Sequence, residues 1–450
     1  MPSRIVVTHS SPSDDDARNR TGRPADLLIA WHGDRANVSA QLGAVRAPGE
    51  SELPSAAQDL LDITTALYAA DIAIKRGERE QWPRTFELAV PVRDVELWSG
   101  LTGDLHRLLY ELTRDTVRLS FYADDPPAAA EPVAERVPPG LHPDCVSMLS
   151  GGLDSLAGAV MLQHTGRRPI YTLHRSGNPA VRTAQELALA ALNAHWPGAS
   201  TARPCDVEPN PRGEDTLPFP APEDREASRR CRSLLFMALA LATAEAAGVD
   251  EAYMCENGVL TAGLPFSAAR AGSMSTHSTH PLAIALMNRI AQAAGLRARL
   301  LNPFVYQTKA ELIRDVLAPN LSVQEIQRTA SCWAVGRANR QCGGCVPCLL
   351  RQIGMAWAEL PPEAHMVDVL SRPGDYVGTD AYGNLVDVLR QAEQILRQSD
   401  AEVLVAQPGL LSLHSAGLEV GSVVAMLRRN AEQTLTVVRE RYPKAARLIE

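Results

Sequence analysis

The spacing of apolar residues changes along this chain, and the changes divide it into regions. Residues 1–50 mix Pro, Gly, Ser and charged side chains around one strand candidate at 27–31. Beyond them the pattern predicts a helix over 60–75, a strand over 85–92, a helix over 103–112 and a strand over 117–122. These elements predict a small α+β unit over residues 1–124, in which no chemistry can be read.

A second region begins after residues 125–143, which are rich in Pro, Ala and Glu and have the composition of a linker. Strands and helices then alternate: strands at 146–149, 169–174 and 251–255, and helices at 156–164, 180–195 and 224–247. This alternation predicts a parallel sheet with helices on both faces, whose ligands bind at the carboxyl ends of the strands. The predicted α/β domain covers residues 144–358. The last region, 359–450, is predicted to be a helical tail, with amphipathic segments at 382–397 and 420–442 and no catalytic constellation.

Composition narrows the class of protein. The chain has 450 residues, a formal charge of −8 and 45% hydrophobic residues, which is typical of a globular protein and argues against general binding of nucleic acid. The longest apolar run, 234–242, is too short to cross a bilayer, and residues 1–20 lack the apolar core of a signal peptide. We therefore expect a cytoplasmic protein without membrane contact, in which eight cysteines favour metal binding over disulfides.

The most informative segment lies where the strand at 146–149 passes into the helix at 156–164. It reads Ser150-Gly151-Gly152-Leu153-Asp154-Ser155. The two glycines let successive N–H groups and a helix N-terminus point at one anion, so that the amides and the serine hydroxyls could hold phosphate oxygens. Asp154 could cap the helix or bind Mg²⁺. No Gly-Lys-Ser/Thr follows, which argues against a Walker A loop.

Four of the eight cysteines form a second motif, with the spacing C-x9-C-x2-C-x2-C: Cys332, Cys342, Cys345 and Cys348. Tight Cys-x-x-Cys turns present thiolates at tetrahedral angles, and a shell of four thiolates makes a structural Zn²⁺ site. The alternatives are a chance cluster of buried cysteines and a redox pair, and the redox pair leaves the distal Cys332 unexplained. The other four cysteines are expected in the core: Cys145, Cys205, Cys231 and Cys255.

The two motifs together resemble a known family. The loop is similar to the SGGxDS pyrophosphate loop of the PP-loop ATP pyrophosphatases. The chain further resembles QueC, the 7-cyano-7-deazaguanine synthase, in three segments: Thr308-Lys309-Ala310-Glu311, the element from Ser331 to Arg351, and Arg232-Ser233-Leu234-Leu235-Phe236, in which Ser233 stands where Asn is usual. This resemblance covers about residues 145–357. It implies a HUP-like PP-loop fold with a zinc-binding element at 331–352.

A looser resemblance concerns the N-terminal region. Its residues Tyr68, Asp71, Trp82-Pro83-Arg84 and Val90-Pro91-Val92 are similar to the N-terminal extension of QatC, the QueC-like component of the Qat anti-phage defence systems. If this resemblance holds, the protein belongs to a defence system.

The resemblance to QueC implies the chemistry. Enzymes of that family use ATP, Mg²⁺ and 7-carboxy-7-deazaguanine: the carboxylate attacks the α-phosphate, pyrophosphate leaves, and an amine attacks the acyl-adenylate. The family pattern implies that residues 150–155 hold the pyrophosphate and that Asp154, Ser155, Lys309 and Arg232 are catalytic. An exposed helix lysine is the alternative for Lys309. Arg229 and Arg232 lie three apart on one face of the predicted helix, where a solvated helix start is the alternative to binding of a carboxylate or phosphate.

Substrate binding is expected at Glu256, Asn257 and Gly258, which follow a predicted strand. A carboxylate such as Glu256 could accept both N–H groups on one edge of a guanine-like ring, and an ordinary turn is an equal alternative. The polar loop at 273–280 could add hydroxyl contacts. Its His277 and His280 could bind a metal, but the four thiolates already account for zinc.

The regions outside the resemblance suggest an acceptor larger than ammonia, such as the N-terminal amine of a partner protein from the same defence operon. One alternative is a stand-alone 7-cyano-7-deazaguanine (preQ0) synthase that uses ammonia. A tRNA-modifying enzyme is another, and the acidic charge disfavours it. A catalytically silent scaffold for partner proteins is the last, and the intact loop and Lys309 argue against it.

Overall fold

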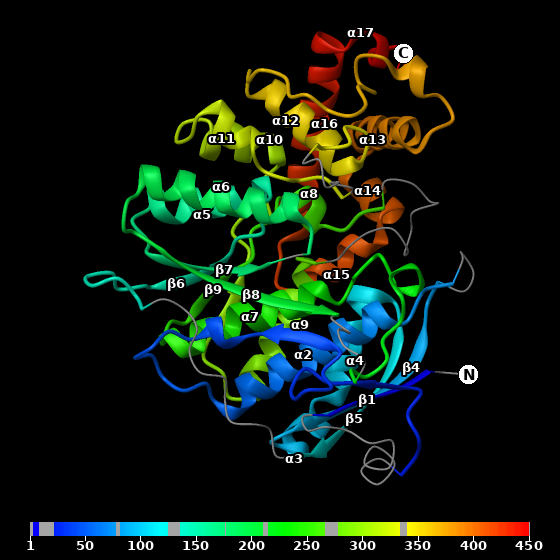
Figure 1. The fold of residues 1–450 in the computed structure, drawn as a ribbon. Helices are drawn as coiled ribbons and strands as arrows, with labels where there is room; N and C mark the ends of the chain where they lie inside the picture. Colours follow the sequence, from blue (N-terminus) through cyan, green and yellow to red (C-terminus); the bar gives the residue numbers. More distant parts are fainter. Residues whose placement is uncertain are drawn as a thin grey trace.

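The computed structural model describes residues 3–8, 22–77, 82–124, 136–175, 177–209, 215–265, 278–333 and 340–449. Helices lie above and below a central sheet, with a smaller N-terminal sheet at one end of the molecule and C-terminal helices at the other (Figure 1).

The central sheet has six strands in the order β10-β9-β6-β7-β8-β3. Five of these strands are parallel, and β3 pairs antiparallel with β8 at one edge. The strands are β3 (Val38–Gln41), β6 (Cys145–Met148), β7 (Pro169–His174), β8 (Thr201–Pro209), β9 (Glu251–Tyr253) and β10 (Arg299–Leu301). Every residue of β6 and β7 is buried, because both faces of the sheet are covered.

Helices cover this sheet on both faces, with α5 and α6 on one and α7 and α9 on the other (Figure 1). They are α5 (Leu153–His164), α6 (Pro179–His195), α7 (Arg232–Ala247) and α9 (Pro281–Ala293). The left-handed Gly248 ends α7, as its position after the last apolar residue predicts. The predicted fold class, a parallel α/β sheet between two layers of helices, is confirmed.

Two local expectations in this domain differ from the structure. The helix predicted over 224–247 begins only at Arg232, because Pro222–Asp224 forms a 3-10 turn and Arg229 takes a left-handed φ of 46°. The sequence pattern also failed to indicate β8. One buried position of β8 is occupied by Arg203, which is fully buried and forms an ion pair with Glu50. This charged residue interrupts the alternation of apolar and polar residues that would have indicated a strand.

The N-terminal region forms a second sheet with the order β2-β1-β4-β5, in which all strands are parallel. Its elements are β1 (Ser3–Val7), β2 (Leu27–Ile29), β4 (Thr85–Val92), β5 (Thr116–Ala123), α2 (Ser55–Ala73), α3 (Val95–Gly100) and α4 (Thr102–Thr113). The strands and helices predicted between residues 60 and 122 are all found. β1 and β3, which lie within the mixed first 50 residues, were not expected.

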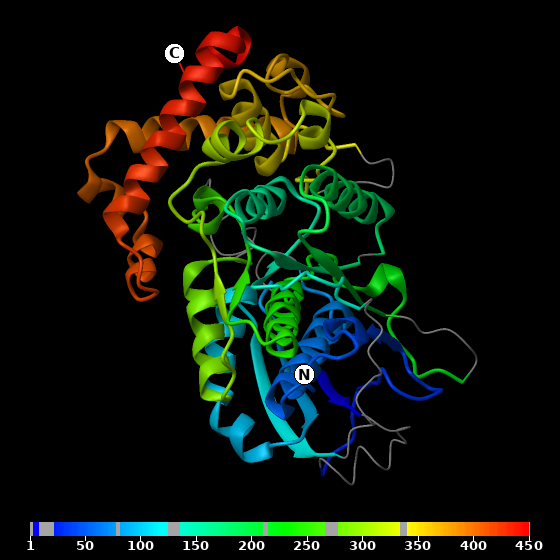
Figure 2. The same ribbon diagram turned by 90° about the vertical axis from the view of Figure 1, so that its left-hand side faces the viewer.

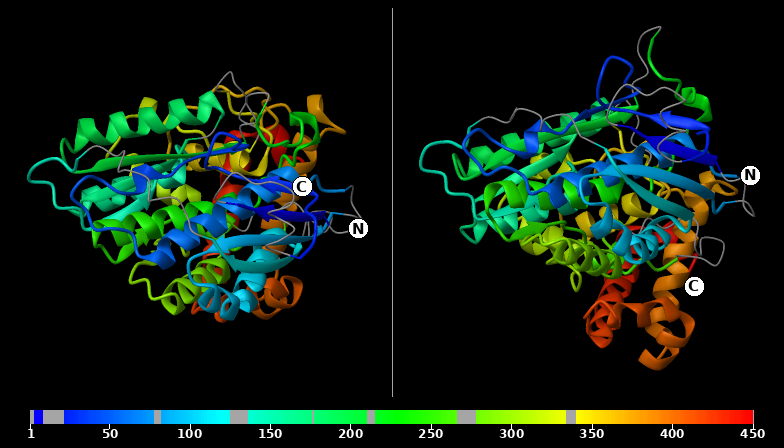
Figure 3. Two further views of the ribbon diagram at one scale, coloured as in Figure 1. Left: turned by 60° about the horizontal axis from the view of Figure 1, so that its bottom comes forward. Right: turned by 90° about the horizontal axis from the view of Figure 1, so that it is seen from below.

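The two sheets share one apolar core. β3 belongs to the N-terminal region but extends the central sheet, and α2 packs along α7. Side chains of both helices, including Tyr68 and Leu235, belong to the same buried cluster. Figure 3 shows the blue and cyan N-terminal elements lying against the green helices of the central domain. This packing brings α2 to the beginning of α7.

Many of the remaining helices lie at the end of the molecule opposite the N-terminal sheet, but the C-terminal region also reaches α9 (Figure 1). Four short or medium helices follow parts of the central sheet: α8 (Gly258–Thr261), α10 (Lys309–Glu311), α11 (Val323–Gln327) and α12 (Val346–Trp357). The C-terminal helices are α13 (Asp380–Arg397), α14 (Asp400–Ala406), α15 (Leu411–His414), α16 (Val420–Arg441) and α17 (Pro443–Ala446). They form a second apolar core together with α8 and α12, and α16 crosses this group in red in Figure 2. None of the helices in the described part of the chain is long and apolar enough to span a membrane.

The order of the central strands places the site. After β6 the chain adds β7 and β8 on one side, and it then crosses over to add β9 and β10 on the other. In open parallel sheets, ligands bind outside the carboxyl ends of the two strands at this reversal, here β6 and β9. The loop at 150–155 follows β6 and the segment 256–258 follows β9, so the topology brings the two expected sites together.

Candidate functional site

The loop after β6 has a backbone that requires glycine. Gly151 has a φ of 82°, and a Cβ at this position would meet the backbone nitrogen of Gln185 on α6 at 2.9 Å. The loop therefore packs directly against the backbone of α6 and turns sharply into α5.

The serines of the loop hold it closed. The hydroxyl of Ser155 accepts hydrogen bonds from the backbone N–H of Ser150 at 3.2 Å and from the Ser150 hydroxyl at 3.0 Å, and it donates to the carbonyl of Gly152 at 2.9 Å. The N–H of Gly152 in turn points at the Ser150 hydroxyl, 3.3 Å away. Both serine hydroxyls that the sequence analysis assigned to phosphate oxygens therefore form hydrogen bonds within the loop.

Asp154 faces across the site instead of capping α5. The helix is capped at Gly152 without a side-chain hydrogen bond, so the capping alternative for Asp154 is wrong. Its Oδ2 accepts from Nζ of Lys309 at 2.6 Å and from Nδ2 of Asn257 at 3.3 Å. Its Oδ1 is buried without a hydrogen-bond partner among the described residues, which leaves one carboxylate oxygen for a cation.

Lys309 is buried, with 1% of its surface exposed, which excludes the exposed-lysine alternative. It is the first residue of α10. Thr308 caps this helix: its hydroxyl accepts from the N–H of Glu311 at 3.1 Å, and the Glu311 carboxylate accepts from the N–H of Thr308 at 2.9 Å. This capping box fixes the direction in which the lysine leaves the backbone.

Glu256 and Asn257 lie between these groups and the end of β9. Asn257 caps the short helix α8, so the residues read from sequence as a loop are the beginning of a helix. A side-chain hydroxyl, that of Thr279, donates to the carboxylate of Glu256. Burial and, next, the negative charge of Asp154 raise the pKa of Glu256 to about 7, although Thr279 and Lys309 act in the opposite direction.

The sequence reasoning missed Asn302, which holds Glu256 in place. Its Oδ1 accepts from the N–H of Glu256 at 3.3 Å, and its Nδ2 donates to the Glu256 carbonyl at 2.9 Å and to the hydroxyl of Thr261 at 3.1 Å. Asn302 follows β10 directly. The signal that could have identified it was a polar residue after a short apolar run, but that run was not recognised as a strand.

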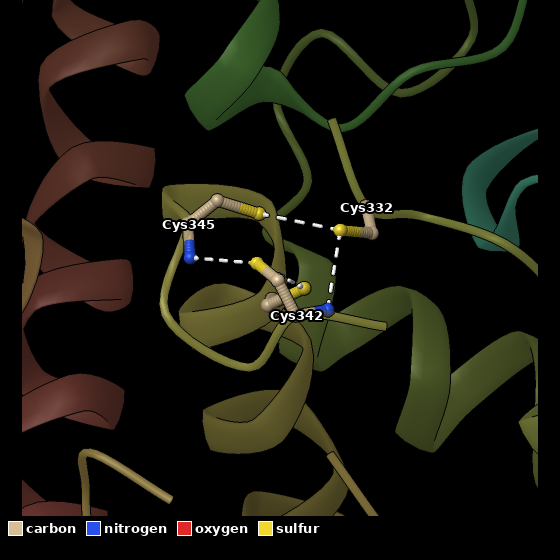
Figure 4. A group of neighbouring side chains, drawn as sticks. Cys332, Cys342 and Cys345 are labelled. Carbon is tan, nitrogen blue, oxygen red and sulfur yellow. Dashed lines mark hydrogen bonds between the residues drawn. The ribbon is translucent and has the colours of Figure 1, made fainter. Parts of the chain in front are cut away.

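The four cysteines of the second motif meet in one cluster. Their sulfur atoms all lie within 4.8 Å of one another, and the Cys342–Cys348 and Cys345–Cys332 pairs are 3.9 Å apart. A tetrahedral Zn²⁺ with four Zn–S bonds of about 2.3 Å needs sulfur separations of roughly 3.8 Å, so the cluster fits the metal. Figure 4 shows the sulfur atoms of Cys332, Cys342 and Cys345 facing one another. Cys145, Cys205, Cys231 and Cys255 are buried elsewhere, as predicted.

The cysteine element is joined to the loop after β6. The N–H of Leu153 donates to the hydroxyl of Ser331 at 3.3 Å, and the N–H of Ala330 donates to the carbonyl of Gly151 at 2.9 Å. The Ser331 hydroxyl also accepts from the buried guanidinium of Arg351 at 3.2 Å. One of the loop amides expected to face phosphate is therefore paired with the residue that precedes Cys332.

Arg229 and Arg232, which were expected on one face of a helix, do not share one. Arg229 stands before α7 and donates to the hydroxyl of Tyr68 and to Glu208, both at 3.3 Å. Arg232 opens α7 and is exposed, and its guanidinium lies 5.7 Å from the ring centre of Phe236. Within the described part of the chain, Arg232 forms no hydrogen bond or ion pair with Asp154 or Lys309. The structure thus brings Asp154, Lys309, Glu256 and Asn257 together, and leaves Arg232 apart from them.

The histidines of the polar loop are partly outside the structure. Residues 273–277, including His277, lie outside the described residues. His280 caps α9 by accepting from the N–H of Leu282 at 3.3 Å. Among the described residues, the four cysteines are the one group of three or more His, Cys, Asp or Glu side chains that could hold a metal ion.

The fold is that of an α/β protein with a QueC-like PP-loop architecture and a four-cysteine cluster that could bind zinc. Residues 228–359 match the family model described as "Queuosine biosynthesis protein QueC". The 7-cyano-7-deazaguanine synthase of Anaeromyxobacter sp. is 30% identical over 233 residues, which are 48% of this chain and 93% of that protein. That of Magnetococcus marinus is 30% identical over 239 residues (49% and 95%), and that of Nitrosococcus oceani is 26% identical over 230 residues (49% and 96%). The chain belongs to the QueC family. Its particular likeness to QatC stays a prediction.

Proposed function

We propose that this protein uses ATP to adenylate the carboxylate of 7-carboxy-7-deazaguanine and then transfers the acyl group to an amine. The observation that carries the proposal is the largely buried Asp154–Lys309 pair beside a glycine-rich loop at the reversal point of the sheet. Membership of the QueC family supports the same reaction class, because relatives along half of the chain are named 7-cyano-7-deazaguanine synthases.

Each group of the site has a role in this proposal. The amides and hydroxyls of residues 150–155 bind the departing pyrophosphate, and Lys309 neutralises charge on the phosphates. The free Oδ1 of Asp154 is the oxygen that fits Mg²⁺. Bound there, Mg²⁺ supplies positive charge to the phosphate oxygens. Zinc in the four-cysteine cluster has a structural role, since four thiolates leave no open position.

The reaction balances without a protein nucleophile. A carboxylate oxygen forms a bond to the α-phosphorus, the bond from this phosphorus to the bridging oxygen breaks, and pyrophosphate leaves with the electron pair. The amine nitrogen then attacks the acyl carbon, AMP leaves with the former carboxylate oxygen, and the amine loses a proton. In this proposal Glu256, whose pKa is raised to about 7, and Asn257, which donates to Asp154, contact the base of the substrate. Arg232 lies apart from this group at the start of α7, and its catalytic role stays a prediction.

Two acceptors are compatible with the first step. The names of the relatives favour ammonia and release of the nitrile. The regions outside the matched half favour a larger amine, such as the N-terminus of a partner protein in an anti-phage system: α2 contacts the start of α7, and α16 contacts the segment that carries Lys309.

Product analysis separates these acceptors. The purified protein is incubated with ATP, 7-carboxy-7-deazaguanine and either ammonium ions or the neighbouring gene products, and all small molecules and intact proteins are weighed by mass spectrometry. A protein that gains the mass of the acyl group supports transfer to a partner, and free amide or nitrile alone contradicts it. Pyrophosphate release that survives Asp154→Ala and Ser155→Ala contradicts the role of the loop. Absence of any pyrophosphate release supports a silent scaffold.

A further inference from the structure

The C-terminal helix α16 contacts the two segments that surround Asp154. One segment carries Lys309, and the other is the turn at Asn257 and Gly258. In Figure 1 α16 runs beside α8, α10 and α12, and residues of all three helices contact it. Neither the sequence motifs nor the family resemblance assigns a function to α16.

The most direct contact joins Gln433 to Thr308. The hydroxyl of Thr308 donates to Oε1 of Gln433 at 2.7 Å, and both side chains are buried, with 0% and 5% of their surface exposed. The Thr308 hydroxyl already accepts from the N–H of Glu311, so its single proton is directed to Gln433. Gln433 thereby fixes the rotamer of the residue that caps the helix of Lys309.

Arg429, one turn earlier on α16, also binds the segment that carries Lys309. Its Nε donates to the carboxylate of Glu311 at 2.7 Å, and its Nη2 donates to the carbonyl of Tyr306 at 2.7 Å. Glu311 is the other half of the capping box. Two adjacent turns of α16 therefore hold the residues on both sides of Lys309.

The close approach of Met426 to Gly258 shows that α16 also packs against the turn at Asn257 and Gly258. A Cβ at Gly258 would lie 2.9 Å from Cε of Met426 and 2.4 Å from the carbonyl oxygen of Val305. Gly258 further donates its N–H to the carbonyl of Gln307 at 2.7 Å. The turn that carries Asn257 and the turn that carries Lys309 are therefore packed together on one helix.

We propose that Gln433 is a positioning residue for Lys309, through its hydrogen bond with Thr308, and that α16 thereby belongs to the active site. The inference rests on the proposed adenylation, because it assigns Lys309 to the phosphates. It predicts that loss of the Gln433 acceptor slows catalysis while leaving substrate binding and the fold in place. A misplacement of the ammonium group by a fraction of an ångström lowers a phosphoryl-transfer rate without removing a binding contact.

The test compares Gln433→Met, which keeps the length of the side chain without its acceptor, with Thr434→Val. Thr434 is also buried on α16, but its hydroxyl donates to the carbonyl of Asn430 within the same helix, at 2.7 Å. We expect Gln433→Met to lower kcat for pyrophosphate release by about fivefold to twentyfold, with KM for the deazaguanine acid unchanged within about twofold. Thr434→Val should keep both constants. Thr308→Val should lower kcat at least as much as Gln433→Met, because it also removes the hydroxyl that accepts from the N–H of Glu311. Thr308→Ser should recover most of this loss, and the double variant should be no slower than the worse single variant.

A second measurement does not depend on activity. Lys309 is labelled with an amine-reactive ester and its modification rate is followed by peptide mass spectrometry in folded protein. We expect faster labelling in Gln433→Met than in wild type or Thr434→Val. Equal kcat values and equal labelling in Gln433→Met and wild type would overturn the inference, as would equal losses in Gln433→Met and Thr434→Val. A wild type without pyrophosphate release would instead contradict the proposed function, and the labelling rates would still decide whether Gln433 positions Lys309.

Discussion

Nζ of Lys309 lies 2.6 Å from Oδ2 of Asp154, and both side chains are largely buried. The two residues are 155 positions apart in the chain, and each comes from the first turn of a helix. A buried charge that loses its partner keeps its desolvation penalty, so each residue of the pair depends on the other for stability as well as for chemistry.

Replacing the lysine should therefore affect both properties. We expect Lys309→Met to lower the rate of pyrophosphate release by at least about 100-fold, since it removes a fixed positive charge from the phosphate site. It should also lower the free energy of unfolding by roughly 3 kcal/mol, because Asp154 is left unpaired. An assay of released pyrophosphate measures the rate, and chemical denaturation measures the free energy of unfolding. Lys444→Met, on an exposed lysine of α17, is the control and should change neither; a Lys309→Met enzyme with normal rates would remove the lysine from the mechanism.

Glu256 should make stability depend on pH in the substrate-free protein. Its pKa is raised from 4.5 to about 7, chiefly by burial and then by Asp154. Between these two values the folded chain keeps a proton that the unfolded chain has released, so the free energy of unfolding falls as the pH rises through this window. Glu256→Gln cannot titrate and therefore lacks this pH-dependent loss of stability. From pH 5 to pH 8 the melting temperature of the wild type should fall relative to that of the variant. The corresponding difference in the free energy of unfolding should be roughly 1–3 kcal/mol. Glu440→Gln, at an exposed position, should follow the wild type at every pH; a Glu256→Gln curve parallel to wild type would contradict the prediction.

The cysteine cluster predicts one zinc ion per chain. Elemental analysis of purified protein should give a ratio near one, and Cys342→Ser should lower it strongly, because a site with three thiolates binds zinc less tightly. Removal of zinc with a chelator should lower the melting temperature. Cys205→Ala, at a buried cysteine outside the cluster, should keep the metal. Wild-type protein purified without zinc, and unable to take it up, would show that the cluster is an apolar contact of reduced cysteines.

Ser331 should connect the cysteine element to the use of ATP. Its hydroxyl accepts from Leu153 in the loop and from Arg351, so Ser331→Ala leaves two donors without this acceptor. We expect KM for ATP to rise about threefold to tenfold, while zinc content stays at one, because the loop loses an anchor and the thiolates are untouched. Ser412→Ala, which loses a surface hydroxyl bond to Gly409, is the matched control. An unchanged KM in Ser331→Ala would mean that the loop is held well enough by Ser150, Ser155 and Ala330.

The sequence by itself determined the parts of this protein that are local or carried by fixed spacing. The loop at 150–155 is readable because two adjacent glycines and two serines between a strand and a helix define one backbone shape. The four cysteines are readable because short Cys-x-x-Cys turns leave few ways to arrange their sulfurs. The parallel α/β sheet follows from strands and helices that alternate at their own periods.

Only the tertiary structure decided which distant residues share the site. Asp154 was expected to cap a helix or bind Mg²⁺, and its partners Lys309 and Asn257 come from other elements. Arg229 was expected on a helix face and takes a left-handed backbone conformation instead. The contact of Gln433 with Thr308 spans 125 positions and leaves no mark in any local pattern. The physical reason is that side-chain periodicity records only which face of an element is buried, whereas a hydrogen bond or ion pair depends on the register in which two such faces pack.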